Sequence, residues 1–220
     1  MKAKKIMIVR HAEKPADSGA PYGVDINGNQ DPESLIPQGW QRAGALAAFF
    51  DPADGKLRAP GIATPQHLYA SGVGKHSNSL RPQETITPLS EKLGIKINSK
   101  YKKGDEADMI KDAMGCGGIV LIAWEHQDIP GIANLILGNS TTAPQKWPGD
   151  RFDIVWIFDL QNGAYLFSQV PQRLLAGMAI LSFRLTEEKN RQTISSPVCL
   201  WGFNTHPVPA CQNSSELFMT

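Results

Sequence analysis

Two uninterrupted apolar runs, residues 6–9 (IMIV) and 118–124 (GIVLIAW), constrain the fold of this chain more than any other feature. Both are rich in β-branched residues and neither alternates with polar ones, which is typical of strands that are buried on both faces. Strands of this kind belong to a mostly parallel sheet whose two faces are covered by helices. The runs therefore predict an α/β protein in which these two segments lie inside the sheet.

The remaining segments supply helices and strands that suit this architecture. The apolar spacing predicts helices at residues 40–50, 82–93, 105–114 and 129–137, and further strands at 67–70, 95–97, 153–158 and 164–167. Pro88 falls inside the second helix and is expected to distort it. Helices that alternate with strands predict a three-layer α/β/α sandwich, and the turn-like residues 161–163 (QNG) add an antiparallel pair at the end of the sheet.

The chain is predicted to hold one catalytic domain, residues 1–178, followed by a tail, residues 179–220. A chain of 220 residues is long enough for one good-sized core. The tail is polar, contains proline and shows no sustained apolar period, so we expect it to be loosely attached and partly disordered. Residues 14–38 are rich in Pro, Gly, Asn and Asp, which predicts a long loop of the kind that often serves as a lid.

Composition excludes several classes of protein. Lys and Arg total 22 against 21 for Asp and Glu, so a net charge of +1 provides no general field for nucleic acid or an anionic membrane. Three cysteines without a C-x-x-C pair argue against a disulfide framework and a structural zinc site. The apolar runs are too short for a signal peptide or a membrane span. We expect a soluble, cytoplasmic protein with no metal, no cofactor and no membrane or nucleic-acid partner.

The two apolar runs end in chemically similar residues. The first leads into Arg10 and His11, and the second leads into Glu125 and His126. Ligands of open α/β sheets bind beyond the carboxyl ends of the strands, so both histidines are expected at one site. Arg81 is a third contributor, because Pro82 suits the first turn of a helix and places Arg81 at an N-terminus that already favours anions.

Together, these side chains predict a cationic pocket for a tetrahedral dianion. The planar fork of an arginine such as Arg10 or Arg81 can grip two oxygens at once. A neutral imidazole, of His11 or His126, offers a lone pair near pH 7 and can carry a phosphoryl group covalently. The sequence contains no H-E-x-x-H, no complete P-loop and no G-x-S-x-G, which disfavours the zinc peptidase, P-loop and serine hydrolase classes.

Four segments resemble the histidine phosphatase superfamily, also called the phosphoglycerate mutase-like family, and they occur in that family's order. They are IMIVRHAEK, LIPQGWQRAGALAAFF, LYAS with SLRPQETITPLSEKLG, and GIVLIAWEHQDIPGIA, and they span roughly residues 4–170. Two departures stand out. RHAE replaces the RHGE that is common in the mutases, and the loop at residues 72–79 is longer than in compact members.

The resemblance implies a phosphoglycerate mutase-like fold and a two-step phosphoryl transfer. His11 would attack phosphorus and form a phosphohistidine, while Arg10, Arg81 and His126 would hold the phosphoryl oxygens. Water would then release phosphate, without a metal ion. The implied substrate is a small phosphorylated metabolite or a phosphoprotein, including a phosphohistidine protein. The alternatives are a mutase of the phosphoglycerate type and a phosphate-binding regulatory protein without turnover.

The proton donor is left open among four acidic residues. Glu13 follows the nucleophile closely and is favoured, although it is equally suited to orienting a neighbour. Asp105 and Glu106 lie where other branches of the family carry their donor, and Asp128 follows the second histidine. Glu125 is expected to point away from the pocket, because side chains alternate along a strand.

Overall fold

The computed structural model describes residues 2–176, so the predicted tail and its boundary at residue 178 lie outside the described residues. Six strands and four helices occur within this range. In chain order they are β1 (Lys5–Arg10), α1 (Pro37–Phe50), β2 (His67–Ala70), α2 (Arg81–Leu93), β3 (Ile97–Asn98), α3 (Glu106–Gly115), β4 (Ile119–Trp124), α4 (Ile129–Leu137), β5 (Ile154–Gln161) and β6 (Ala164–Pro171).

The strands form one mixed sheet in the order β3-β2-β4-β1-β5-β6. The pairs β1–β4, β2–β4 and β2–β3 are parallel, whereas β5 pairs antiparallel with both β1 and β6. The two apolar runs therefore become the neighbouring strands β1 and β4 in the middle of the sheet. The predicted mostly parallel α/β sheet with an antiparallel edge is confirmed.

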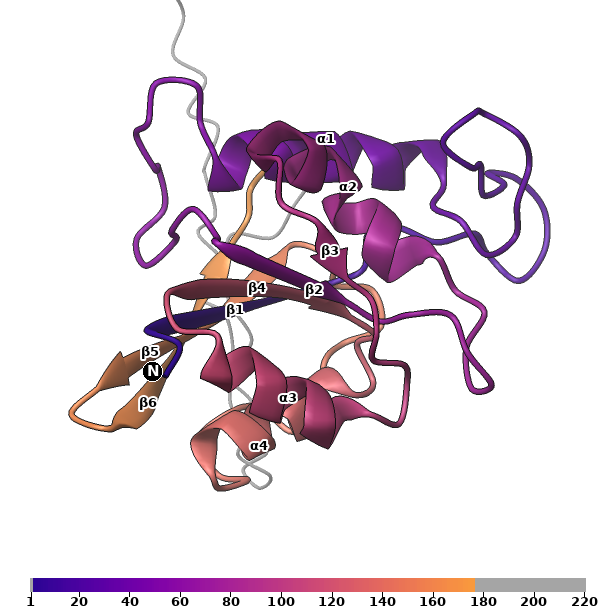
Figure 1. The fold of residues 1–220 in the computed structure, drawn as a ribbon. Coiled ribbons are helices and arrows are strands. Elements are labelled where there is room, and N and C mark those ends of the chain that lie inside the picture. The colour runs from indigo at the N-terminus through magenta and orange to yellow at the C-terminus, as the bar shows by residue number, and fades with distance from the viewer. Residues whose placement is uncertain (1, 177–220) are drawn as a thin grey trace, which may run out of the picture. The chain divides into compact units, whose positions relative to one another are not determined.

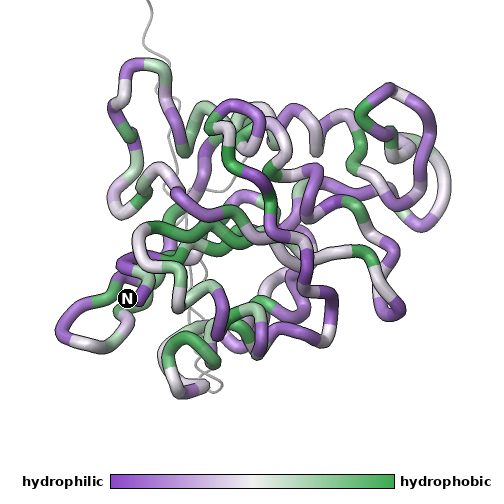
Figure 2. The backbone as a smooth tube through the Cα atoms, viewed as in Figure 1, coloured by the Kyte–Doolittle hydropathy of each residue, from purple (hydrophilic) through white to green (hydrophobic). Residues whose placement is uncertain are grey.

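Helices cover both faces of the sheet, which confirms the three-layer prediction. Figure 1 shows α1 and α2 on one face and α3 and α4 on the other. Alternate side chains of β1 pack against the helices on opposite faces of the sheet. Met7 and Val9 pack with residues of α1 and α2, while Ile6 and Ile8 pack with residues of α3 and α4. The central strands are the most continuously apolar part of the described chain, as their colour in Figure 2 shows. Burial on both faces is the reason why these runs lack polar alternation.

Several elements differ in length from the sequence-based prediction, for local reasons. Helix α1 begins at Pro37 instead of residue 40, because proline fits the first turn, where its missing N–H costs nothing. Strand β3 begins at Ile97, because the N–H of Ile95 still donates to Ser90 O in the C-terminal cap of α2. Strands β5 and β6 are longer than predicted, because they remain in register up to a tight turn at Asn162 and Gly163, both with positive φ.

Helix α2 continues through Pro88 up to a left-handed cap at Gly94. Proline cannot donate the hydrogen bond of an ordinary helical residue, so one link of the helical ladder is missing at Pro88. Ile86 and Leu89 on either side of it are fully buried, and their packing holds this turn against the sheet. No helix within residues 2–176 is both long enough and apolar enough to cross a membrane.

Candidate active site

The parallel pairing of β1 and β4 brings their carboxyl ends to the same edge of the sheet. Arg10 lies opposite Trp124 in the register, and the N–H of His11 donates to Trp124 O at 3.0 Å. A cleft of about 320 Å³ opens at this edge. It is lined by His11, Lys14, Glu33, Ser77, Asn78, Ser79, Arg81, Glu125, His126 and Gln127. The structure thus places both histidines and Arg81 around one cleft.

His11 is held as a neutral imidazole whose proton is on Nδ1. Its Nδ1 lies 2.7 Å from Ala12 O, and because a carbonyl oxygen can only accept, Nδ1 must carry the proton. The lone pair is then on Nε2. Only 4% of the residue is exposed, and burial, reinforced by the positive charge of Arg10, lowers the pKa of His11 to about 3. The ring is therefore unprotonated at neutral pH, as a nucleophile must be.

The loop that carries His11 is tied to α2. The N–H of Ala12 donates to Thr85 Oγ1 at 2.8 Å, and the Thr85 hydroxyl in turn donates to Arg81 O at 2.7 Å. Thr85 is fully buried, so solvent does not compete for these bonds. This chain of contacts sets the position of His11 relative to the first turn of the helix that bears Arg81.

Arg10 precedes His11 in the chain, but it is not one of the side chains that line the cleft. Its Nη1 donates to Gly149 O at 2.6 Å, and its guanidinium stacks 3.8 Å from the centre of the Phe152 ring. Burial lowers the pKa of Arg10 to about 10, which leaves the group charged at neutral pH. Its buried Nε has no hydrogen-bond partner among residues 2–176. An unpaired buried donor of a charged group is costly, so Arg10 is held at this position at the expense of stability.

Arg81 faces the cleft and also fastens the long loop over it. Its Nη2 donates to Pro32 O at 2.6 Å and its Nε donates to Ser34 O at 3.3 Å. Its Nη1 donates to the hydroxyl of Ser79, which also lines the cleft, at 3.2 Å. One side chain therefore links the loop at residues 14–38 to the anion-favouring N-terminus of α2.

His126 follows β4 and completes the basic lining of the cleft. Burial, followed by the charge of Arg10, lowers the pKa of His126 to about 4, so this ring is also neutral at pH 7. The permanent positive charge around the cleft thus comes from Arg10, Arg81 and Lys14, while the histidines supply ring nitrogens. Such a set suits an anion that is held by arginines and approached by a neutral nucleophile.

Glu13, the favoured proton donor, does not line the cleft. Its carboxylate is paired with Arg42 of α1, whose Nε donates to Glu13 Oε2 at 2.9 Å and whose Nη2 donates to Oε1 at 2.5 Å. Arg42 also donates to Gln172 Oε1 at 2.9 Å. The sequence analysis missed Arg42, although it shares the buried face of α1 with Ala43 and Leu46, and a charge at such a position indicates a buried partner.

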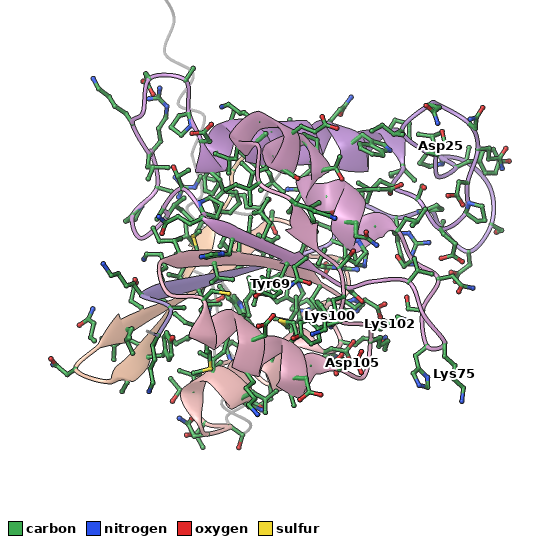
Figure 3. All side chains as sticks on the ribbon, in the orientation of Figure 1. Asp25, Tyr69, Lys75, Lys100, Lys102 and Asp105 are labelled. Atoms are coloured by element: carbon green, nitrogen blue, oxygen red, sulfur yellow. The ribbon has the colours of Figure 1, made fainter. Side chains whose placement is uncertain are left out.

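The other three acidic candidates also lie outside the residues that line the cleft. Asp105 directly precedes α3, and its carboxylate accepts the N–H of Lys102 at 3.0 Å. Figure 3 labels both residues. Glu106 accepts the indole N–H of Trp124 at 3.2 Å. Asp128 lies 3.6 Å from Lys103 Nζ, and burial raises the pKa of this carboxyl.

Glu125 lines the cleft, which corrects the expectation that it points away. Strand β4 ends at Trp124, so the alternation of side chains stops one residue before Glu125. The carbonyl of Glu125 instead accepts the N–H of Asp128 in the turn that leads into α4. Its carboxylate accepts a hydrogen bond from Lys103 Nζ at 2.6 Å.

No group of three or more His, Cys, Asp or Glu side chains within residues 2–176 is arranged to hold a metal ion. The described part of the chain thus offers the cleft an anion-binding lining and no set of metal ligands. The expectation that the protein uses no metal remains a prediction.

Comparison with known proteins gives similar solved structures only. No family model and no curated protein matches this chain. A protein of Agrobacterium tumefaciens assigned as the phosphohistidine phosphatase SixA has a TM-score of 0.46 at 13% identity, over 75% of this chain and 97% of its own. A mycobacterial glucosyl-3-phosphoglycerate phosphatase has a TM-score of 0.45 at 11% identity, over 76% and 98%. A phosphoserine phosphatase from Entamoeba histolytica has a TM-score of 0.44 at 16% identity, over 78% and 99%. All three are described as phosphatases.

Proposed function

We propose that this chain is a phosphatase that hydrolyses a phosphate monoester, or a phosphohistidine protein, through a phosphohistidine at His11. The observation that carries the proposal is the state of the His11 ring. Its Nδ1–H is committed to Ala12 O and its pKa is far below neutrality, so a free lone pair on Nε2 remains in a cleft lined by Arg81 and His126. Burial keeps the ring uncharged, and the hydrogen bond to Ala12 O decides that the lone pair is on Nε2.

In the first step, Nε2 of His11 attacks phosphorus while the bond from phosphorus to the ester oxygen breaks. The leaving oxygen takes a proton, which a substrate bound as its monoanion supplies from its own phosphoryl group. Arg81 and His126 hold the phosphoryl oxygens, and Arg10 adds a positive charge that acts on both histidines. Fixed charges of this kind stabilise the transition state without reorganising during the reaction, and they carry most of the acceleration in phosphoryl transfer.

In the second step, water attacks phosphorus and the bond between phosphorus and Nε2 breaks. The electron pair returns to Nε2, so the ring is again neutral with its proton on Nδ1. Inorganic phosphate leaves the cleft and the enzyme is regenerated. This scheme requires neither a metal ion nor a cofactor. A cleft of about 320 Å³ accommodates a phosphoryl group with a small adjoining part of the substrate.

His11→Ala tests the proposal, with His67→Ala as a matched control. His67 is the first residue of β2, at the opposite end of that strand from the cleft. Hydrolysis of p-nitrophenyl phosphate and of a panel of phosphorylated metabolites and phosphohistidine proteins is measured with EDTA present. We expect His11→Ala to lower kcat at least about 10⁴-fold, the order found when a covalent nucleophile is removed, and His67→Ala to leave it unchanged.

Radiolabelled substrate separates the proposed phosphatase from its alternatives. The phosphatase yields an acid-labile label on His11 and inorganic phosphate in solution. A mutase would yield the label on His11 but return it to the substrate as an isomeric ester. A phosphate-binding protein would yield no covalent label. Undiminished turnover in folded His11→Ala would refute the proposal.

A further inference from the structure

We propose that Glu125 is the base that activates water for hydrolysis of the phosphohistidine, a role that rests on the function proposed above. Glu125 precedes His126 in the chain, and both residues line the same cleft as His11. A base for this step must reach a water molecule that stands opposite the bond from phosphorus to Nε2. It must therefore come from the lining of this cleft.

Two carboxylates line the cleft, and their surroundings differ. Glu33 has a side chain that is 42% exposed, and its carboxylate lies 3.6 Å from Nη2 of Arg81. That position places Glu33 beside a group proposed to hold the phosphate, where its negative charge would repel a bound anion. Glu125 has a side chain that is only 16% exposed, and it pairs with Lys103, which does not line the cleft. Of the two, Glu125 is the carboxylate placed to take a proton.

The pair with Lys103 suits a base better than an acid. Lys103 Nζ lies 2.6 Å from Glu125 Oε2, and this hydrogen bond raises the pKa of Lys103. Because the ammonium group of Lys103 has only donors, Glu125 is the acceptor in this pair, and a carboxylate in the acceptor role can take a proton from water. The other oxygen, Oε1, accepts no hydrogen bond from any residue between 2 and 176, so it is available to a water molecule.

The proposed step balances as follows. Oε1 of Glu125 removes one proton from water as the water oxygen forms its bond to phosphorus. The bond from phosphorus to Nε2 of His11 breaks, and its electron pair returns to the ring. Hydrogen phosphate leaves, and the proton on Glu125 passes to solvent through the mouth of the cleft. Glu125 has no part in breaking the ester bond, so it acts on the second step alone.

The separation of steps defines the experiment. Glu125→Gln is mixed rapidly with p-nitrophenyl phosphate, and p-nitrophenol release, phosphate release and labelled phosphohistidine are followed. We expect the first-turnover burst of p-nitrophenol to stay within about threefold of the unsubstituted protein. We expect phosphate release to slow by about 10²- to 10⁴-fold, the usual contribution of a general base. The labelled phosphohistidine should then accumulate.

Two further variants complete the test. Asp128→Asn is the matched control, because Asp128 also lies near Lys103 but does not line the cleft, and we expect it to keep full turnover. Glu125→Ala leaves room for a small base, and added formate is expected to restore phosphate release to it. Thermal melts establish that each variant is folded.

Unchanged phosphate release in Glu125→Gln, or loss of the burst together with turnover, would overturn the role of Glu125. Failure of added formate to restore phosphate release in Glu125→Ala would also overturn this role. If the unsubstituted protein forms no phosphohistidine, it is the proposed function that fails, and this result is distinct from any result with the Glu125 variants.

Discussion

Replacing Arg42 by Met is expected to be one of the most destabilising single substitutions in the described part of the chain. The side chain of Arg42 is 2% exposed and that of Glu13 is 11% exposed, and two guanidinium nitrogens contact the two carboxylate oxygens. Methionine fills much of the volume but leaves the Glu13 carboxylate buried without its cation. Breaking a buried pair by removing one partner typically costs about 3–5 kcal/mol in the free energy of unfolding.

The consequence is large relative to the stability of an ordinary domain. A total of about 5–15 kcal/mol would fall by about a fifth or more, and for a chain of this size each kcal/mol lowers Tm by about 2–4 °C. Arg42→Met should therefore melt roughly 6–20 °C below the unsubstituted protein. It should also lower the turnover of the proposed phosphatase, since Glu13 belongs to the loop that carries His11 and its carbonyl accepts the N–H of Ile36.

A double-mutant cycle measures the pair itself. Urea unfolding followed by tryptophan fluorescence is recorded for Arg42→Met, Glu13→Gln and the double variant. Because the double variant contains no buried charge at this position, we expect it to be more stable than Arg42→Met, with a coupling of about 2 kcal/mol or more. If Arg42→Met costs under about 1 kcal/mol, or if the two single effects simply add, the inferred buried pair is wrong.

Two further predictions concern the cleft. Burial holds the pKa of His11 at about 3, whereas the unfolded chain has the ordinary value near 6.5, so the unfolded state binds an extra proton between these values and the protein loses stability as the pH falls below 6.5. His11→Asn should remove up to about 1.4 kcal/mol per pH unit of that loss between pH 6 and 4, as measured by urea unfolding, and equal slopes would contradict the burial of His11. Arg81→Lys cannot keep both loop contacts and a forked grip on phosphate, so we expect kcat/KM to fall about 10- to 100-fold and the loop at residues 14–38 to be cleaved faster by protease. Unchanged kcat/KM would exclude Arg81 from substrate binding.

The centre of the fold could be predicted from the sequence because burial leaves a local signature. Successive residues of β1 and β4 face opposite helix layers, and the residues that face either layer are apolar. The resulting lack of polar alternation in the sequence predicted that both strands lie between two layers of helices. The ends of elements were harder, because they depend on hydrogen bonds of single residues. The cap at Gly94, for example, delays β3 by two residues relative to the predicted start at residue 95.

Residues of the site that directly follow a strand could be predicted from the sequence. Contacts between side chains that are far apart in the sequence could not. His11, Arg81 and His126 were placed together by topology alone, and the structure sets them around one cleft. The partner of Glu13 lies 29 residues away on α1, and no short motif reports such a contact. The prediction that Glu125 points away from the cleft was wrong, because it applied the alternation of strand side chains to a residue that follows the end of β4.

The position of β1 between β4 and β5 has a consequence for synthesis on the ribosome. β1 precedes both of its partners, whose paired residues begin at Ile119 and Val155, by more than one hundred residues. At ordinary rates of translation the apolar residues of β1 wait on the order of ten seconds before either neighbour emerges. His11, at the end of β1, therefore cannot reach its final position in a nascent chain, and throughout that interval the segment IMIV is an exposed apolar stretch of the kind that chaperones bind.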